Sequence, residues 1–126
     1  RRICPHCKEE MVPSPKLKDE LMKEIRNLTD SAKKEISGKV NLDNPKFYKG
    51  KGCRYCQNEG YQGRIGIFEV FEMKEGMRDL VLKNASKDEL YEQARKSGMV
   101  TIKEDGMIKV LEGHTTIEEV MRVTKM

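Results

Sequence analysis

Two short runs of sequence, Cys4-Pro5-His6-Cys7 and Cys53-Arg54-Tyr55-Cys56, decide how this chain folds. Each run is a C-x-x-C pair, and 45 residues separate the two pairs. A C-x-x-C turn directs two thiolates toward one point, and two such turns complete the tetrahedral four-sulfur shell that zinc prefers, with bonds of about 2.3 Å. The pairs therefore predict a zinc site that joins distant parts of the chain. Its expected ligands are Cys4, Cys7, Cys53 and Cys56.

Other uses of these cysteines are open at this point. Four sulfur ligands leave no position for water, so the metal would be structural, and ligand type alone does not separate zinc from iron. Two disulfides would require an oxidising compartment. The first run also resembles the active-site motif of disulfide oxidases with the thioredoxin fold. That fold needs a strand before the motif and a helix after it, whereas three residues precede Cys4 and two prolines, Pro13 and Pro15, follow Cys7.

The composition indicates a highly charged domain with a thin, aliphatic core. The chain has 126 residues, of which 37% are charged and 6% aromatic, and it has no tryptophan. Its net charge is +4, and the basic excess lies in residues 1–60, where the balance is +5. We interpret this excess as compensation for the negative charge that four thiolates keep around a divalent metal. We expect no nucleic-acid partner, although a basic patch can be a phosphate footprint.

Nothing in the sequence predicts a membrane span. No window approaches the ~18 consecutive apolar residues of a spanning helix, and no short apolar segment behind a basic start indicates a signal peptide. The sequence begins Arg1-Arg2-Ile3-Cys4, without a Met and with a metal-type motif almost at once. We therefore expect a soluble, intracellular protein or a piece of one, and the start of the sequence favours a fragment whose upstream part is missing.

The segment between the cysteine pairs is predicted to form one long helix and then a loop. Ser14-Pro15 suits a helix start, because Ser14 can cap the helix and a proline is tolerated at its first position. Apolar residues then recur at steps of three and four, and Ser37-Gly38 ends a predicted helix of about six turns. Residues 39–52 are predicted to form a loop, with local disorder within residues 37–52. The apolar positions are Leu17, Leu21, Ile25, Leu28, Ala32 and Ile36.

Residues 64–71 are predicted to form the one clear strand, because β-branched and aromatic side chains are closely spaced there. We expect residues 1–3 to pair beside it. This pairing would place both cysteine pairs at one end of a small sheet.

The remainder of the chain has the pattern of short helices. A first apolar helix is expected around Met77 and Leu80. Three capping boxes follow, in which Ser86, Thr101 and Thr116 each precede a glutamate by three residues. The expected fold class is α+β, with a small zinc-bound sheet end, a long helical insertion and a compact C-terminal helical subdomain. The predicted subdomains are 1–72, with the insertion at about 14–50, and 73–126.

The sequence contains no arrangement typical of a catalytic site. His6 lies inside its C-x-x-C turn and is interpreted as a spectator to the metal, and His114 follows Gly113 at a helix boundary, which favours a structural role. There is no G-x-x-x-x-G-K-[ST] nucleotide loop, since Gly50-Lys51-Gly52 and Gly60-Tyr61-Gln62-Gly63 lack its spacing. We therefore predict no catalytic residue and no cofactor-binding residue besides the metal ligands.

Three segments resemble a known family. Residues 52–70, GCRYCQNEGYQGRIGIFEV, closely resemble the tetracysteine region of bacterial type II secretion and type IV pilus assembly ATPases, and residues 1–8, RRICPHCK, look like its other half. Residues 113–123, GHTTIEEVMRV, are similar to the helical C-terminal end of that family. The long helix and loop between the cysteine pairs look like an enlarged insertion.

The resemblance implies a hexameric motor that hydrolyses ATP in the cytoplasm, at the inner membrane. Its nucleotide loop, acidic motifs and arginine fingers would lie upstream of Arg1. ATP and Mg²⁺ would bind only in that parent protein, and the fragment alone would bind structural zinc without hydrolysing ATP. The implied partners are the upstream ATPase core, neighbouring subunits of the hexamer and the inner-membrane platform protein. The motifs do not separate secretion, pilus extension and DNA uptake.

A rival interpretation is a free-standing zinc-ribbon module that binds nucleic acid through its basic half. Such a module would need exposed aromatic side chains among the basic ones, on which bases could stack. The candidates are Phe47, Tyr48, Tyr55 and Tyr61.

Overall fold

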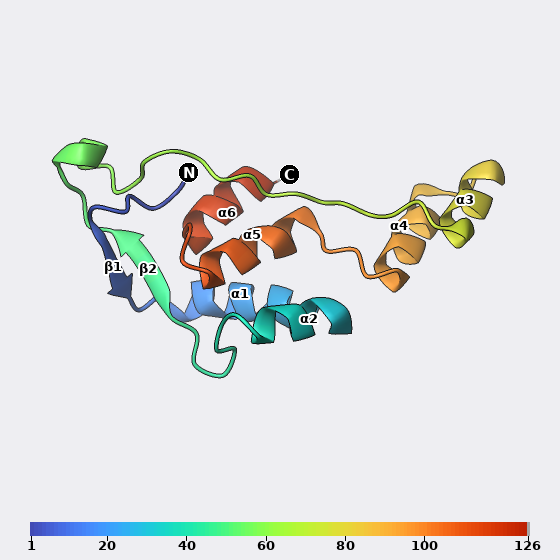
Figure 1. Ribbon diagram of the computed structural model, residues 1–126, viewed down its shortest axis with the longest axis horizontal. Helices are drawn as coiled ribbons and strands as arrows, with labels where there is room; N and C mark the ends of the chain where they lie inside the picture. The colour runs from blue at the N-terminus through green and yellow to red at the C-terminus, as the bar shows by residue number, and fades with distance from the viewer. Residues whose placement is uncertain (126) are drawn as a thin grey trace.

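The computed structural model describes residues 1–125 and places a two-stranded sheet beside a group of packed helices (Figure 1). The strands are β1 (Lys8–Met11) and β2 (Phe47–Gly50), and a 3-10 turn, η1, spans Arg54–Cys56. The α+β class predicted from the sequence is confirmed. Within residues 1–125, none of the helices has the length and apolar character of a membrane span. The helices are α1 (Pro15–Arg26), α2 (Asp30–Ser37), α3 (Glu75–Leu82), α4 (Lys87–Lys96), α5 (Ile102–Leu111) and α6 (Ile117–Thr124).

The sheet is formed by segments other than the predicted ones. β1 and β2 pair antiparallel, with Lys8 opposite Gly50 and Met11 opposite Phe47. The prediction of a strand at residues 64–71 is wrong: this segment runs extended along the helices, and its only bridge joins Val70 to Val100. Strand-forming side chains are not sufficient without a neighbouring strand to pair with. β2 also lies inside residues 39–52, which the sequence predicted to be a loop.

The predicted six-turn helix is interrupted. α1 ends at Arg26 and α2 begins at Asp30, because the Thr29 side chain accepts a hydrogen bond from the Ala32 N–H at 3.4 Å and caps a new helix. Leu28 is buried in the connection between them. The predicted apolar positions nevertheless face one core, because the apolar sides of α1 and α2 both pack into the same buried cluster.

One apolar core joins α1, α2, β2, α5 and α6, which together with β1 we call the helical body. The segment between the cysteine pairs thus packs against the C-terminal helices. α5 and α6 approach closely at Gly106, where a Cβ atom would lie 2.5 Å from a methyl group of Val120. The fully buried side chains of this core include Leu21, Met107, Val110 and Val120.

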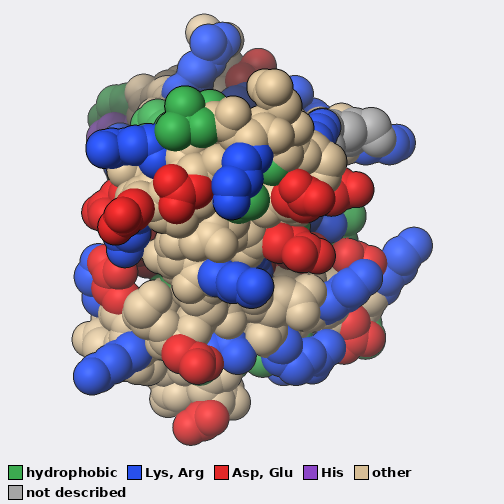
Figure 2. Space-filling view, turned by 90° about the vertical axis from the view of Figure 1, so that its right-hand side faces the viewer, with side chains coloured by type: hydrophobic (Ala, Val, Ile, Leu, Met, Phe, Trp, Pro, Cys, Tyr) green, Lys and Arg blue, Asp and Glu red, His purple; other side chains and the backbone are tan. Residues whose placement is uncertain are grey.

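Helices α3 and α4 form a separate pair at the far end of the molecule from the sheet (Figure 1), and we call this pair the distal hairpin. Its own core is small, consisting of buried Met77, Ala94 and Met99 with Leu90 packed against them. Figure 2 views the molecule from this end, where acidic and basic side chains are interspersed around a small hydrophobic patch.

The predicted capping boxes at Ser86 and Thr101 are confirmed. The third is half correct, because Thr116 accepts a hydrogen bond from the Glu119 N–H at 3.2 Å but the Glu119 carboxylate does not return to the cap. That carboxylate instead accepts hydrogen bonds from Arg1 and Arg122. Hydrogen bonds from guanidinium groups to a carboxylate are stronger than one from a backbone N–H, so the Glu119 carboxylate pairs with the arginines and not with the Thr116 N–H.

Candidate metal centre

The four cysteine sulfurs form one cluster, in which all of them lie within 4.8 Å of one another. The Cys4 and Cys53 sulfurs are 3.8 Å apart, as are those of Cys7 and Cys56, and the Cys53 and Cys56 sulfurs are 3.7 Å apart. A regular tetrahedron with metal–sulfur bonds of about 2.3 Å has edges of about 3.8 Å. The cluster therefore has the size and donor set of a site that could hold one metal ion.

Backbone pairing brings the two distant C-x-x-C turns together. The first turn leads into β1 and the second follows β2, so the antiparallel sheet places the turns at the same end. The Cys4 N–H donates to Gly60 O at 2.9 Å, and the Lys51 N–H donates to Cys7 O at 3.0 Å. Gly50 and Gly60 lie so close together that a Cβ atom on Gly50 would overlap the backbone carbonyl group of Gly60. Glycine is required there to let the chains approach.

Three backbone N–H groups donate to the sulfurs. Gly52 N–H donates to Cys7 Sγ at 3.2 Å, while Cys56 Sγ accepts from Cys53 N–H at 3.3 Å and from Gly60 N–H at 3.2 Å. Burial raises the pKa of Cys56, but these two donors and the neighbouring thiols outweigh it and lower the pKa to about 6. Burial raises the pKa of Cys7 to about 12. The backbone donors thus favour a thiolate at Cys56, and the thiolate is the form that binds metals.

The structure also bears on the other uses of these cysteines. None of the four forms a disulfide, and the sulfur separations of 3.7 and 3.8 Å are far longer than a disulfide bond of about 2.05 Å. His6 is outside the cluster, and its ring stacks on Tyr55 with the centroids 4.0 Å apart. No long helix follows Cys7, since β1 begins at Lys8, so the thioredoxin-type arrangement is absent from this part of the chain.

The cysteine end, by which we mean residues 1–7 and 51–63, rests on the start of α6. Ile3 N–H donates to His114 O at 2.9 Å, and the Thr115 hydroxyl donates to Arg1 O at 2.8 Å. The Tyr61 and Thr116 hydroxyls are 2.7 Å apart. These contacts could not be predicted from local sequence patterns, because they join residues separated by more than fifty positions.

Glu119 is the central acidic group of this junction. Its carboxylate is almost fully buried and accepts hydrogen bonds from the Arg122 and Arg1 side chains, Arg1 at 2.9 and 3.0 Å. The Arg122 guanidinium, followed by that of Arg1, holds the pKa of Glu119 well below its usual range. The negative charge of Glu119 therefore persists at neutral pH and links the cysteine end to α6.

The aromatic residues required by the nucleic-acid interpretation are engaged elsewhere. Phe47 is buried in the core, the Lys8 ammonium covers the Tyr48 ring, and the Arg1 guanidinium covers the Tyr61 ring. Tyr55 is half exposed but stacks on His6. These side chains do not form a shared surface on which bases could stack.

The chain thus combines an α+β fold with four cysteines at the end of its sheet that could hold a metal ion. The chain belongs to the family described as type II/IV secretion system protein, whose model matches residues 1–122. It is 39% identical over 124 residues to the type IV pilus assembly ATPase PilB of Thermus thermophilus and 37% identical over 125 residues to type II secretion system protein E of Pseudomonas aeruginosa. It is 36% identical over 125 residues to type II secretion system ATPase E of Vibrio cholerae.

These alignments cover 98%, 99% and 99% of this chain but only 12%, 22% and 22% of the three relatives. The chain therefore corresponds to a small part of each relative. The resemblance predicted from the cysteine runs and the residue 113–123 segment is confirmed at the level of the family.

Proposed function

We propose that this chain is the metal-binding and C-terminal part of an ATPase that powers type IV pilus assembly or type II protein secretion. The names of the relatives support this assignment, and the similarity extends over nearly the whole chain. The chain contains no nucleotide loop of the P-loop type, so ATP and Mg²⁺ would bind elsewhere in the parent protein. Alone, it would not hydrolyse ATP.

The metal would be a structural zinc ion held by Cys4, Cys7, Cys53 and Cys56. The observation that carries this proposal is the sulfur cluster, whose separations of 3.7 and 3.8 Å match the edge of a tetrahedral zinc–thiolate site. Since all four positions would be occupied by sulfur, the ion would activate no water. It would fix the two C-x-x-C turns and, through the bridge between Ile3 and Tyr61, the contact with α6.

In the parent protein, we propose a cytoplasmic hexamer at the inner membrane. The zinc-fixed cysteine end and the helical body would then form one stiff unit beside the ATPase core, because hydrogen bonds and the Glu119 contacts join them. Such a unit could transmit subunit movements to a neighbouring subunit or to the platform protein. The polar face of α1 and α2 is the candidate contact, since their apolar faces are already packed in the core.

The metal is tested by native mass spectrometry of the chain, compared with the same sample denatured in acid. We expect a native mass higher by one zinc ion and loss of the ion in acid, because protons compete for the thiolates. A mass lower by about four hydrogens would mean two disulfides and would refute the zinc site. An iron mass would correct the identity of the metal.

The assignment to the motor has its own tests. ATP turnover by the isolated chain would contradict the proposal that hydrolysis needs the rest of the parent protein. Deletion of residues 16–50 in the parent is expected to abolish pilus assembly or secretion. Because this deletion also removes core residues such as Leu21, a matched variant should reverse the charge of exposed Lys16 and Lys34 and leave the core intact.

A further inference from the structure

A cavity of about 480 Å³ opens where the loop after α2 meets the sheet and the end of α5. Three lysines line it: Lys8 comes from β1, and Lys39 and Lys46 come from the loop between α2 and β2. None of the four cysteines lines the cavity. The site is therefore distinct from the candidate metal centre.

The cavity has a strong excess of positive charge. Glu112 is the one acidic residue of its lining, and its carboxylate is directed to His114, 3.7 Å away. Within residues 1–125, neither Lys8 nor Lys39 forms an ion pair. Lys46 pairs with Glu10 at 3.4 Å, but both side chains are about two-thirds exposed, so this pair is weak. The lining thus has three lysines against one glutamate, and two of these lysines, Lys8 and Lys39, have no acidic partner within residues 1–125.

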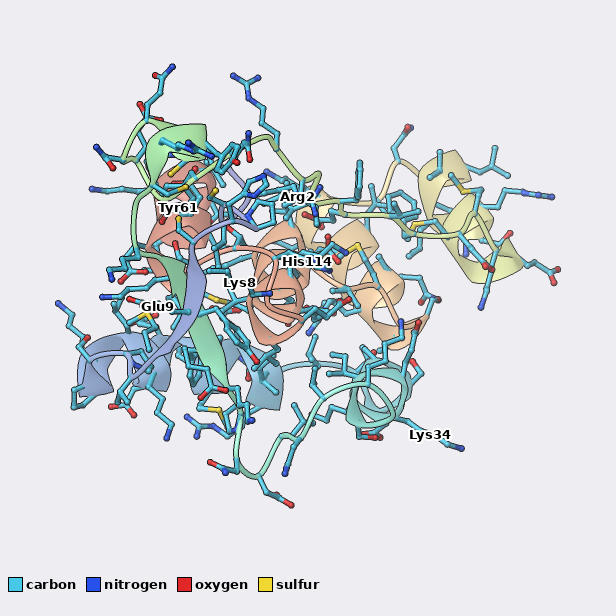
Figure 3. All side chains as sticks on the ribbon, turned by 60° about the vertical axis from the view of Figure 1, so that its left-hand side comes forward. Arg2, Lys8, Glu9, Lys34, Tyr61 and His114 are labelled. Atoms are coloured by element: carbon cyan, nitrogen blue, oxygen red, sulfur yellow. The ribbon has the colours of Figure 1, made fainter. Side chains whose placement is uncertain are left out.

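The walls of the cavity are held in place. The Lys8 ammonium lies over the Tyr48 ring, 4.5 Å from its centroid, and a Cβ atom on Gly113 would come within 2.8 Å of it. Figure 3 shows Lys8 and His114 next to each other where the sheet meets the end of α5. In the loop, the Asn41 side-chain oxygen accepts from the N–H groups of Asp43 and Asn44 at 3.0 and 3.2 Å. This cap gives the loop wall a defined shape.

We propose that this cavity binds a phosphate group, carried either by a free nucleotide or by the headgroup of an anionic lipid. Several ammonium groups around one opening suit a compact anion with more than one negative charge, because each acts as a point charge with mobile donors. The volume lies within the range of about 300–1,000 Å³ that is typical of small-ligand sites. This site is independent of the proposed zinc ion and of ATP hydrolysis by the parent protein.

Lys39 and Lys46 provide the sharpest test. Lys8 also lies beside the carboxyl end of α5, where a cation is favourable without any ligand, so its replacement would be ambiguous. The variant K39A/K46A removes two charges from the lining, and both residues are exposed, so the fold should be retained. The matched control K16A/K34A removes two exposed charges from α1 and α2, outside the cavity.

The complete chain and both variants are titrated by calorimetry with inorganic pyrophosphate and with ADP, and are sedimented with vesicles containing phosphatidic acid. We expect binding by the unchanged chain, a loss of roughly tenfold or more in affinity for K39A/K46A, and a loss under about twofold for K16A/K34A. In a parallel nuclear magnetic resonance titration, the His114 ring signals should shift on binding.

The probes separate the two sources of phosphate. Binding of pyrophosphate or ADP in solution would identify a free phosphate ligand, whereas retention on phosphatidic acid vesicles alone would identify a lipid headgroup. Equal losses for the two double variants would mean general charge attraction and would overturn the proposal. Absence of binding to all three probes would overturn it as well, even if mass spectrometry finds the zinc ion.

Discussion

The cysteine end and the distal hairpin both lie outside the main core, but different interactions hold them. At the cysteine end, four sulfurs converge within 4.8 Å and the chain segments pair through backbone hydrogen bonds. In the distal hairpin, three buried apolar side chains form the core, and a single arginine makes the main connection to the helical body. One end thus relies on a cluster that suits a metal, and the other relies on one buried charge.

The single guanidinium group of Arg95 contacts two different segments of the helical body. Its guanidinium, on α4, donates to both carboxylate oxygens of Glu104 on α5, at 2.6 and 3.0 Å, and to the carbonyl of Asn27 after α1 at 2.6 Å. Glu104 is buried and also caps α5 through the Thr101 N–H. The position of the hairpin therefore depends on electrostatics, whereas the helical body depends on apolar packing.

The largest expected effect comes from breaking the cysteine end. In Cys4→Ser, one C-x-x-C turn loses a thiolate, and the apparent zinc binding energy of about 10–16 kcal/mol seen in small zinc modules would be largely lost. We expect a lower melting temperature and faster hydrogen exchange in residues 1–11 and 47–61, with the distal hairpin unchanged. The conservative control is His6→Ala, since His6 is outside the sulfur cluster. An unchanged melting temperature for Cys4→Ser would count against the zinc proposal.

The reverse experiment targets the hairpin. In Arg95→Met, the buried Glu104 loses its cationic partner, which typically costs about 3–5 kcal/mol when the pair is buried. Hydrogen exchange should accelerate in α3 and α4 and leave the cysteine end protected. Lys103→Met is the matched control, because its pairs with Glu20 and Glu24 are partly exposed and should contribute about 1 kcal/mol or less. Equal effects of the two variants would refute the special role of Arg95.

A core variant should affect both ends together. Met107 is fully buried in the helical body, on which the cysteine end and the hairpin both depend. Met107→Ala is expected to destabilise the chain by about 2–5 kcal/mol in chemical denaturation, because it leaves a cavity. Leu82→Ala, at a position 78% exposed, should change stability by less than about 0.5 kcal/mol. A larger effect at Leu82 would mean that its side chain is packed within the folded chain, which contradicts its exposed position.

The sequence predicted the parts of the molecule that depend on local patterns. The C-x-x-C spacing identified the four sulfurs that cluster, and the capping boxes at Ser86 and Thr101 were correct, because each involves residues within one turn. The apolar face of α1 and α2 was also predicted correctly. The break at Thr29 was missed, because a threonine can either continue a helix or cap a new one, and the free energies of the two arrangements differ little.

The sequence failed where structure depends on distant partners. β1, Lys8-Glu9-Glu10-Met11, has no strand pattern of its own, and it pairs with β2 because the neighbouring cysteine turns and the contact between Gly50 and Gly60 bring the segments together. Residues 64–71 have strand-forming side chains, yet along most of their length no described segment lies in position to pair. Likewise, the Glu119 carboxylate was predicted to cap the start of α6, but it accepts hydrogen bonds from Arg1 and Arg122. Arg1 is distant in the sequence, so a local pattern could not predict this contact.

The smallest expected effect concerns the junction between the cysteine end and the helical body. Arg122 and Arg1 lower the pKa of Glu119 in the folded chain, so its contribution to stability is present above the unfolded value of about 4.3 and is lost as the pH falls toward the folded pKa. In Glu119→Gln, this contribution is absent at every pH. Denaturation midpoints of the two proteins should therefore differ most at neutral pH, and the difference should narrow steadily as the pH falls below about 4 toward the folded pKa. Because acid releases a zinc ion from both proteins alike, the difference between them isolates the carboxylate. A constant difference across this range would mean that Glu119 acts through its shape and hydrogen bonds, and that its charge does not hold the cysteine end to α6.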